Sequence, residues 1–174
     1  MTAKLSPTLD ELRKLEKSVF SMLDDEWMLI TAGNLQSFNT MTASWGGFGI
    51  LWNKPVAFVF VRPTRHTYHF MESADVFTLT FFEEKYRKIL QFCGSRSGRD
   101  TDKIAATGLI PVASPSGGVI FEQAYLSFDC RKIYSTDIDP AHFLDSSIDS
   151  NYPKKDYHSM YIGEITHYQL ISPE

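Results

Sequence analysis

Basic side chains are concentrated in residues 85–103. Six lysines and arginines occur there against two aspartates, although the whole chain of 174 residues carries a formal net charge of -4. Within this stretch, Gly94-Ser95-Arg96-Ser97-Gly98 offers hydroxyls and free backbone N–H groups ahead of an expected helix. Cations combined with such donors suit a phosphate group. A solvated helix face with a glycine-rich turn would explain the same residues.

A second group of anion-binding residue types follows an apolar run at residues 55–61. The segment Arg62-Pro63-Thr64-Arg65-His66-Thr67 holds two arginines and two threonines and no acidic residue. The alternative is a turn that ends a strand, with Thr67 capping a short helix. Two such groups in one acidic chain favour a shared anion more than either group does alone.

A third segment combines small hydroxylated residues with a tryptophan and two glycines. It reads Asn39-Thr40-Met41-Thr42-Ala43-Ser44-Trp45-Gly46-Gly47. Glycine and small side chains let a backbone approach a flat ligand closely. Hydroxyls and N–H groups could bond the polar edge of a heteroaromatic ring while Trp45 covers its face. The same composition is also ordinary for a strand in a β protein.

Several other kinds of site lack support in the sequence. His66 and His69 have no third ligand at metal-binding spacing, so we expect no metal. No dinucleotide or P-loop fingerprint occurs, and Arg96 stands where a nucleophile elbow needs serine. Cys93 and Cys130 form no CxxC motif, which argues against a disulfide framework or a zinc ribbon and fits a reducing cytoplasm.

Composition places the chain among compact single domains. The sequence is 43% hydrophobic and 22% charged, which predicts one domain over residues 1–174 with a well-filled core. Charged residues interrupt the first 15 positions, and the richest apolar run is too short to cross a bilayer. We therefore expect a cytoplasmic protein with neither a membrane nor a nucleic acid polymer as partner.

Hydrophobic periodicity predicts a mainly β, antiparallel fold with flanking helices. Residues 1–25 should contain one amphipathic helix, opened by the capping box Thr8-Leu9-Asp10-Glu11. Cys130 and Tyr134 should lie on the buried face of a strand, with Ser127 and Asp129 on its polar face. The expected strands are 27–31, 37–44, 55–61, 76–82, 122–134 and 160–171, the expected helices are 83–92 and 100–107, and 137–157 should be irregular.

Four segments, taken in order, resemble the flavin reductase family of FMN-binding split barrels, and its flavoredoxin branch in particular. Two are the segments that begin at Asn39 and Arg62. The third is Ser97-Gly98-Arg99-Asp100-Thr101-Asp102-Lys103, and the fourth is His158 followed by Tyr161-Ile162-Gly163-Glu164-Ile165. The resemblance covers residues 39–165 and leaves only the opening helix outside.

The resemblance implies an antiparallel split β-barrel over residues 27–171, assembled as a homodimer with FMN near the subunit interface. It implies that one set of residues lies along the flavin and its ribityl chain, and that another set addresses the phosphate. The first set is Asn39, Thr42, Ala43, Ser44 and Trp45, and the second is Arg62, Thr67, Ser97 and Lys103. His158 becomes a candidate catalytic residue near the flavin.

The family's chemistry implies an oxidoreductase that passes a hydride or electrons from NADH or NADPH through bound FMN to an acceptor. Because no nicotinamide-binding domain is encoded, the nicotinamide would stack over an exposed flavin face. Two alternatives stay open: a non-catalytic FMN storage or sensor protein, and an oxidase of the pyridoxal-phosphate type on the same barrel. The acceptor and the roles of Cys93, His66 and His69 are not readable from the sequence.

Overall fold

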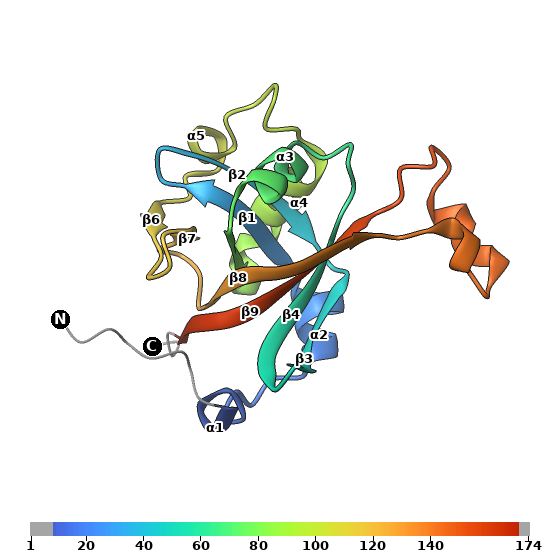
Figure 1. Ribbon diagram of the computed structural model, residues 1–174. Helices are drawn as coiled ribbons and strands as arrows, with labels where there is room; N and C mark the ends of the chain where they lie inside the picture. The colour runs from blue at the N-terminus through green and yellow to red at the C-terminus, as the bar shows by residue number, and fades with distance from the viewer. Residues whose placement is uncertain (1–8, 171–174) are drawn as a thin grey trace.

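The computed structural model describes residues 9–170, and its main feature is a seven-stranded antiparallel sheet that curls into an open barrel (Figure 1). The strand order is β2-β1-β5-β8-β9-β4-β3. The sheet does not close, which confirms the expected split barrel. The strands are β1 (Met28–Asn34), β2 (Ser37–Ala43), β3 (Gly46–Leu51), β4 (Lys54–Val61), β5 (Val76–Phe81), β8 (Leu126–Asp137) and β9 (Ser159–Leu170), while β6 (Pro111–Ala113) and β7 (Val119–Phe121) form a separate pair.

The two edges of the sheet are consecutive in the chain. Strand β2 ends at Ala43 and β3 begins at Gly46, so only Ser44 and Trp45 connect one edge to the other. The two strands adjoin at this corner but form no hydrogen-bonded pair with each other. The barrel is therefore open beside the corner. The sequence did not predict β3, because its three glycines are unfavourable in strands.

The longest strands, β8 and β9, extend beyond the barrel. They carry a projecting arm, residues 138–158, which contains the 3₁₀ turns η3 (Pro140–His142) and η4 (Ser146–Asn151) (Figure 1). The pairing of β8 with β9 shifts register between Lys132 and Tyr134. Tyr134, which the alternation placed in the core, lies beyond this irregularity and is exposed. The prediction for Tyr134 is therefore wrong.

Two residues of the expected polar face of β8 are also buried, whereas Arg131 on the same face is exposed as predicted. Ser127 and Asp129 are as inaccessible as Cys130, which is in the core as predicted. The Asp129 carboxylate accepts a hydrogen bond of 2.8 Å from the backbone N–H of Ser116, in the turn between β6 and β7. A segment distant in sequence thus covers this face, so alternation along β8 alone could not predict its burial.

Helices cover β2 and its neighbours. Helix α4 (Arg87–Ser95) follows the 3₁₀ turn η2 (Glu84–Tyr86) and packs on β2, where the Thr42 hydroxyl donates to the Leu90 carbonyl. Helix α3 (His66–Ser73) begins after Arg65 without a side-chain cap, so Thr67 does not cap it. Helix α5 (Lys103–Thr107) is capped by Asp102, whose carboxylate accepts from two backbone N–H groups. None of the described helices has the length and hydropathy needed to cross a membrane.

The N-terminal segment is not the single helix that its periodicity predicts. It forms two short turns of helix, α1 (Leu9–Leu12) and α2 (Val19–Ser21), and a π-helical turn, η1 (Met22–Glu26). Thr8 of the expected capping box lies outside the described residues. Met22 and Leu23 are buried in the main core. Packing against a curved barrel outweighs continuous helical hydrogen bonding here, because a short helix gains little stability by itself.

Gly163 in β9 provides a test of core packing. A Cβ atom at this position would lie 2.7 Å from Cys130 Cβ and 2.6 Å from Phe77 Cζ. Gly163→Ala should therefore lower the free energy of unfolding by about 1–3 kcal/mol through overpacking. The control is Gly49→Ala in β3, whose Cβ would meet nothing closer than 3.8 Å. Urea unfolding of both variants measures the difference, and equal stabilities would contradict the packing described.

Candidate functional site

A cavity of about 300 Å³ lies beside the corner that connects β2 to β3. We call it the corner pocket. It is lined by Met41, Thr42, Ala43, Ser44, Trp45, Phe60, Arg62, Arg65, Gly94 and His158. The structure thus brings together six of the residues that the sequence analysis singled out for the site, from β2, the corner, the position after β4 and the last residue of the arm. Sequence reasoning did not assign four lining residues to the site, although three of them stand within the segments considered. The four are Met41, Phe60, Arg65 and Gly94, and Phe60 is the one outside those segments.

A second cavity, of about 600 Å³, is lined by two further predicted residues, Asn39 and Lys103. We call it the polar cavity. It lies between the start of β2 and the loop that precedes α5, and its lining includes Gln36, Ser37, Gly98, Arg99 and Thr101. The predicted set is therefore divided between two cavities. Thr67 and Ser97 line neither of them.

Asn39 and Thr67 form a buried hydrogen-bonded pair. The Asn39 amide nitrogen Nδ2 donates to Thr67 Oγ1 at 2.7 Å, which ties β2 to α3. Gly98 lies against this pair, since a Cβ on it would come within 1.9 Å of Asn39 Oδ1. Ser97 begins the same loop, and its hydroxyl accepts from the Arg99 backbone N–H. In this structure these residues hold the loop in place over β2.

Two cations cap the carboxyl-terminal end of α4. The Lys103 ammonium donates to the carbonyls of Cys93, at 2.9 Å, and Thr40, at 2.6 Å. The Arg65 guanidinium donates to the next carbonyl of the helix, that of Gly94, at 2.8 Å. Helix-end carbonyls lack partners within the helix and carry partial negative charge. Among residues 9–170, no carboxylate forms an ion pair with Lys103 or Arg65.

Burial and neighbouring positive charges lower the pKa values of these groups. Burial lowers the pKa of Lys103 to about 8, and the positive charge of Arg65 acts in the same direction. Burial, followed by repulsion from Arg62, lowers the pKa of Arg65. Burial and Arg99 lower the pKa of His66, whose buried Nδ1 has no hydrogen-bond partner. Arg65 in the corner pocket and Lys103 in the polar cavity are cations without a carboxylate partner among the described residues, which fits an anionic group such as a phosphate.

Arg62, predicted to address a phosphate, is engaged elsewhere in this structure. Its guanidinium pairs with Asp156 at 3.1 Å, donates to the Asn151 carbonyl at 2.9 Å and lies over the ring of Tyr152. Thr64 donates to the same carboxylate. These contacts fasten the base of the arm to the wall of the corner pocket.

His158 lies in that wall as a buried, neutral imidazole. Its Nδ1 shares a hydrogen bond of 2.8 Å with the Tyr152 hydroxyl, and its ring packs against Trp45 and Phe60. Burial, followed by repulsion from Arg62, lowers the pKa of His158 to about 4. At neutral pH the side chain therefore carries no charge. Its Nε2 makes no hydrogen bond among the described residues, so it can exchange one hydrogen bond with a molecule in the pocket.

Metal-binding residue types are not clustered in the described part of the chain. Residues 9–170 contain no group of three or more histidine, cysteine, aspartate or glutamate side chains that could hold a metal ion. His66 and His69 stand on α3 with ring centroids 6.2 Å apart, and His69 Nε2 lies 3.1 Å from an Arg99 nitrogen. Arg99 therefore occupies the position beside His69 that a metal ion would need.

Comparisons with known proteins find one family model and several solved structures of the same fold. A family model described as a flavin reductase like domain matches residues 23–174. An FMN-binding protein from Thermus thermophilus shares the fold at 20% sequence identity and a TM-score of 0.65, over 83% of this chain and 70% of that chain. Flavoredoxin of Desulfovibrio vulgaris (Miyazaki F) shares it at 20% identity and a TM-score of 0.65, over 90% of this chain and 75% of that chain. Nitrilotriacetate monooxygenase component B from Mycobacterium thermoresistibile shares it at 17% identity and a TM-score of 0.64, over 86% of this chain and 70% of that chain. No curated protein matches the sequence at a significant level.

The neutral state of His158 gives the protein a specific pH dependence. Between pH 6.5, the ordinary pKa, and about 4, the unfolded chain binds a proton that folded His158 excludes. The free energy of unfolding should therefore fall as pH drops through this window, by an amount on the order of 3 kcal/mol. His158→Asn should lose this part of the dependence, whereas His142→Asn, on the exposed arm, should keep it. Parallel curves for wild type and His158→Asn in urea titrations would contradict the assignment.

Proposed function

The chain belongs to the flavin reductase-like family, and from that premise we propose that it is an oxidoreductase that binds FMN and passes a hydride or electrons from NADH or NADPH to an acceptor. One observation carries the proposal. Arg65 and Lys103 cap the same helix end without any carboxylate partner among the described residues; Arg65 lines the corner pocket and Lys103 lines the polar cavity. An anionic ligand would supply the negative charge that the protein does not.

Arg65 and Lys103 are the residues that would hold the FMN phosphate. Both are fixed by hydrogen bonds to carbonyls, so little side-chain entropy remains to be lost when an anion binds. Asn39 and Thr67 would contribute by holding β2 and α3 together. We assign Arg62 a role other than phosphate binding, because Asp156 already neutralises its charge.

Ala43, Ser44 and Trp45 are the residues that would meet the flavin ring. Thr42 is less suited, because its hydroxyl donates to the Leu90 carbonyl and its side chain contacts α4. Bound FMN would supply the redox chemistry, while the protein orients the ring and tunes its surroundings. His158 would offer the ligand one hydrogen bond from an uncharged ring, and Trp45 and Phe60 would keep water from the same side of the pocket.

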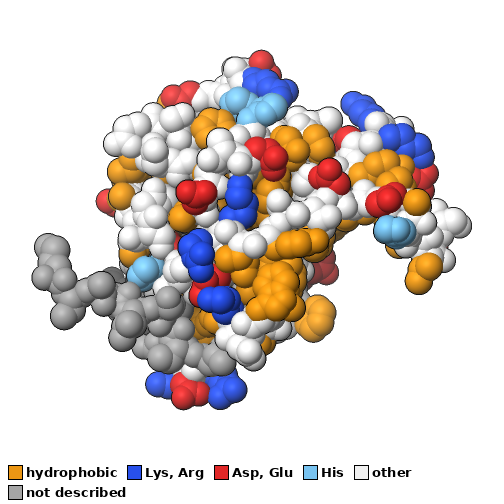
Figure 2. Space-filling view, viewed as in Figure 1, with side chains coloured by type: hydrophobic (Ala, Val, Ile, Leu, Met, Phe, Trp, Pro, Cys, Tyr) orange, Lys and Arg blue, Asp and Glu red, His pale blue; other side chains and the backbone are white. Residues whose placement is uncertain are grey.

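The proposal includes a cytoplasmic homodimer with FMN near the subunit interface. Exposed apolar side chains support an association surface: Leu144 and Ile148 stand out on the arm, and Figure 2 shows hydrophobic side chains both on the arm and over the barrel. Strand β3 also leaves one edge of the sheet unpaired. Monomeric proteins rarely leave apolar patches and strand edges uncovered together.

Anaerobic spectroscopy of the purified protein tests the function directly. The protein should carry the visible absorption band of FMN, and NADH or NADPH should bleach it without added flavin. Ser44→Leu should remain folded but colourless, because a bulky side chain at the corner would occupy the place of the ring. Thr136→Leu, on the exposed part of β8, is the matched control and should stay yellow. Bleaching by dithionite alone, at full occupancy, would favour a storage or sensor protein instead.

The phosphate assignment predicts how FMN affinity depends on pH. Since the pKa of Lys103 is about 8 and only its charged form attracts a phosphate, the affinity for FMN should fall as pH rises above about 8. The slope should approach tenfold per pH unit, because each unit lowers the charged fraction tenfold. Riboflavin, which lacks the phosphate, should show no such fall. Fluorescence quenching of the flavin on binding measures both ligands.

Two substitutions at position 103 sharpen this test. Lys103→Arg keeps a positive charge at every accessible pH and should abolish the fall in affinity. Lys103→Met should weaken FMN at neutral pH by about 1.5–3 kcal/mol, the scale of a hydrogen bond to a charged group, and leave riboflavin nearly unaffected. Identical pH profiles for FMN and riboflavin would remove Lys103 from the phosphate site.

A further inference from the structure

A third cavity lies on the other side of the corner from the pocket just described. It has a volume of about 670 Å³, runs between the N-terminal turns α2 and η1 and the start of β3, and shares Ser44 and Trp45 with the corner pocket. We call it the aromatic cleft, after its residues Phe20, Phe48 and Trp45. A cavity of this volume can take a molecule of two or three fused rings. Trp45 separates it from the proposed flavin site.

The walls of the aromatic cleft expose more aromatic surface than folding requires. Phe20 is 84% exposed and Trp45 is 49% exposed, although burying such side chains would stabilise the protein. Aromatic faces are electron-rich and attract both flat rings and cations. Gly46 and Gly47 continue the wall after Trp45 without side chains that could fill the space. These features suit a flat aromatic ligand.

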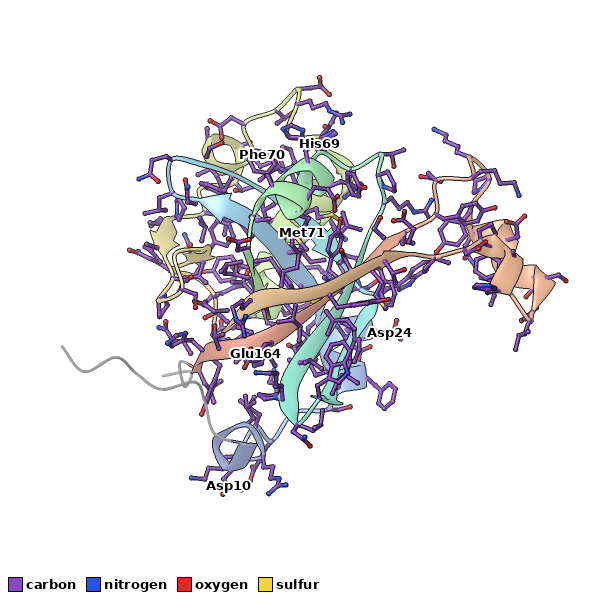
Figure 3. The ribbon with its side chains drawn as sticks, in the orientation of Figure 1. Asp10, Asp24, His69, Phe70, Met71 and Glu164 are labelled. Carbon is purple, nitrogen blue, oxygen red and sulfur yellow. The ribbon has the colours of Figure 1, made fainter. Side chains whose placement is uncertain are left out.

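The rim of the aromatic cleft is acidic. Asp24 and Asp25 line it with exposed carboxylates, and neither forms an ion pair among the described residues; Figure 3 shows Asp24 beside the barrel near β3. Their main chain is fixed, because Trp27 Nε1 donates to the Asp24 carbonyl and Arg87 donates to the Asp25 carbonyl. Arg87 lies over the ring of Trp27, 3.7 Å from its centroid. The nearest arginine therefore bonds to carbonyls rather than to the two carboxylates.

The two sides of Trp45 thus differ in charge. Arg65, which has no carboxylate partner among the described residues, lines the corner pocket, whereas the two aspartates line the aromatic cleft. An anion suited to the first cavity would be repelled by the second. We propose that the aromatic cleft binds planar, positively charged heteroaromatic molecules.

Calorimetric titration of the purified full-length protein tests this proposal with three probes of similar shape. These are the cation 1-methylquinolinium, its uncharged parent quinoline and the anion 1-naphthoate. We expect the cation to bind about fivefold more tightly than quinoline, and 1-naphthoate to bind most weakly. The preference for the cation should shrink in high salt, because exposed carboxylates are screened.

Substitutions outside the proposed flavin site locate the binding. Phe20→Ala should weaken the cation about fivefold. The double variant Asp24→Asn, Asp25→Asn should remove the preference for the cation but keep quinoline binding. Leu144→Ala, which removes another exposed apolar side chain from the arm, and Glu122→Gln, which removes an exposed carboxylate elsewhere, are matched controls and should change nothing.

The same samples separate this proposal from the proposed function. Flavin absorption and bleaching by NADH or NADPH should be unchanged in the Phe20 and aspartate variants. Binding of 1-methylquinolinium that depends on Phe20 and the aspartates would support the cleft even in a protein that carries no flavin. A protein that carries FMN but binds 1-naphthoate as tightly as the cation, or keeps its cation preference in the aspartate variant, would overturn it.

Discussion

The carboxyl-terminal end of α4 is held by two cations, and the rest of the site depends on this interaction. Lys103, in α5, donates to one carbonyl of α4 and one of β2. Arg65, at the start of α3, donates to the next carbonyl of α4. Neutral donors could have satisfied those carbonyls. Using charged groups without a carboxylate partner costs stability, because charge is expensive to bury. In the proposed function, an anion bound beside them would offset this cost and would couple ligand binding to the stability of this helix end.

A second constraint arises from the topology of the sheet. Because its two edges are consecutive strands, the barrel must open beside the two residues that connect them. Trp45 is one of these two residues, and it has a cavity on each side. The strand order therefore accounts for the location of the corner pocket and the aromatic cleft on the two sides of Trp45. Small residues around Trp45 leave both sides open to ligands.

The sequence predicts this site in part, and its errors have physical causes. Alternation and turn residues located β2, β4 and β5, and the corner segment was recognised because its small residues are contiguous. Arg62 and Asp156 are 94 positions apart, so their pairing could not be predicted from local sequence. Nor could any motif indicate that Lys103 donates to carbonyls, since a backbone acceptor has no sequence signature. The prediction of one N-terminal helix is wrong because apolar periodicity indicates which residues contact the barrel. It does not show that those residues belong to one continuous helix.

The arm belongs to the site rather than to the periphery of the molecule. His158 is neutral chiefly because it is buried, and that burial is produced by Trp45 from the corner, Phe60 from β4 and Tyr152 from the arm. Arg62 holds Tyr152 and the end of η4 in place through the Asn151 carbonyl and Asp156. Any partner that displaced the arm would expose His158 to water and raise its pKa toward the ordinary value. The position of the arm therefore controls the pKa of His158 in the corner pocket.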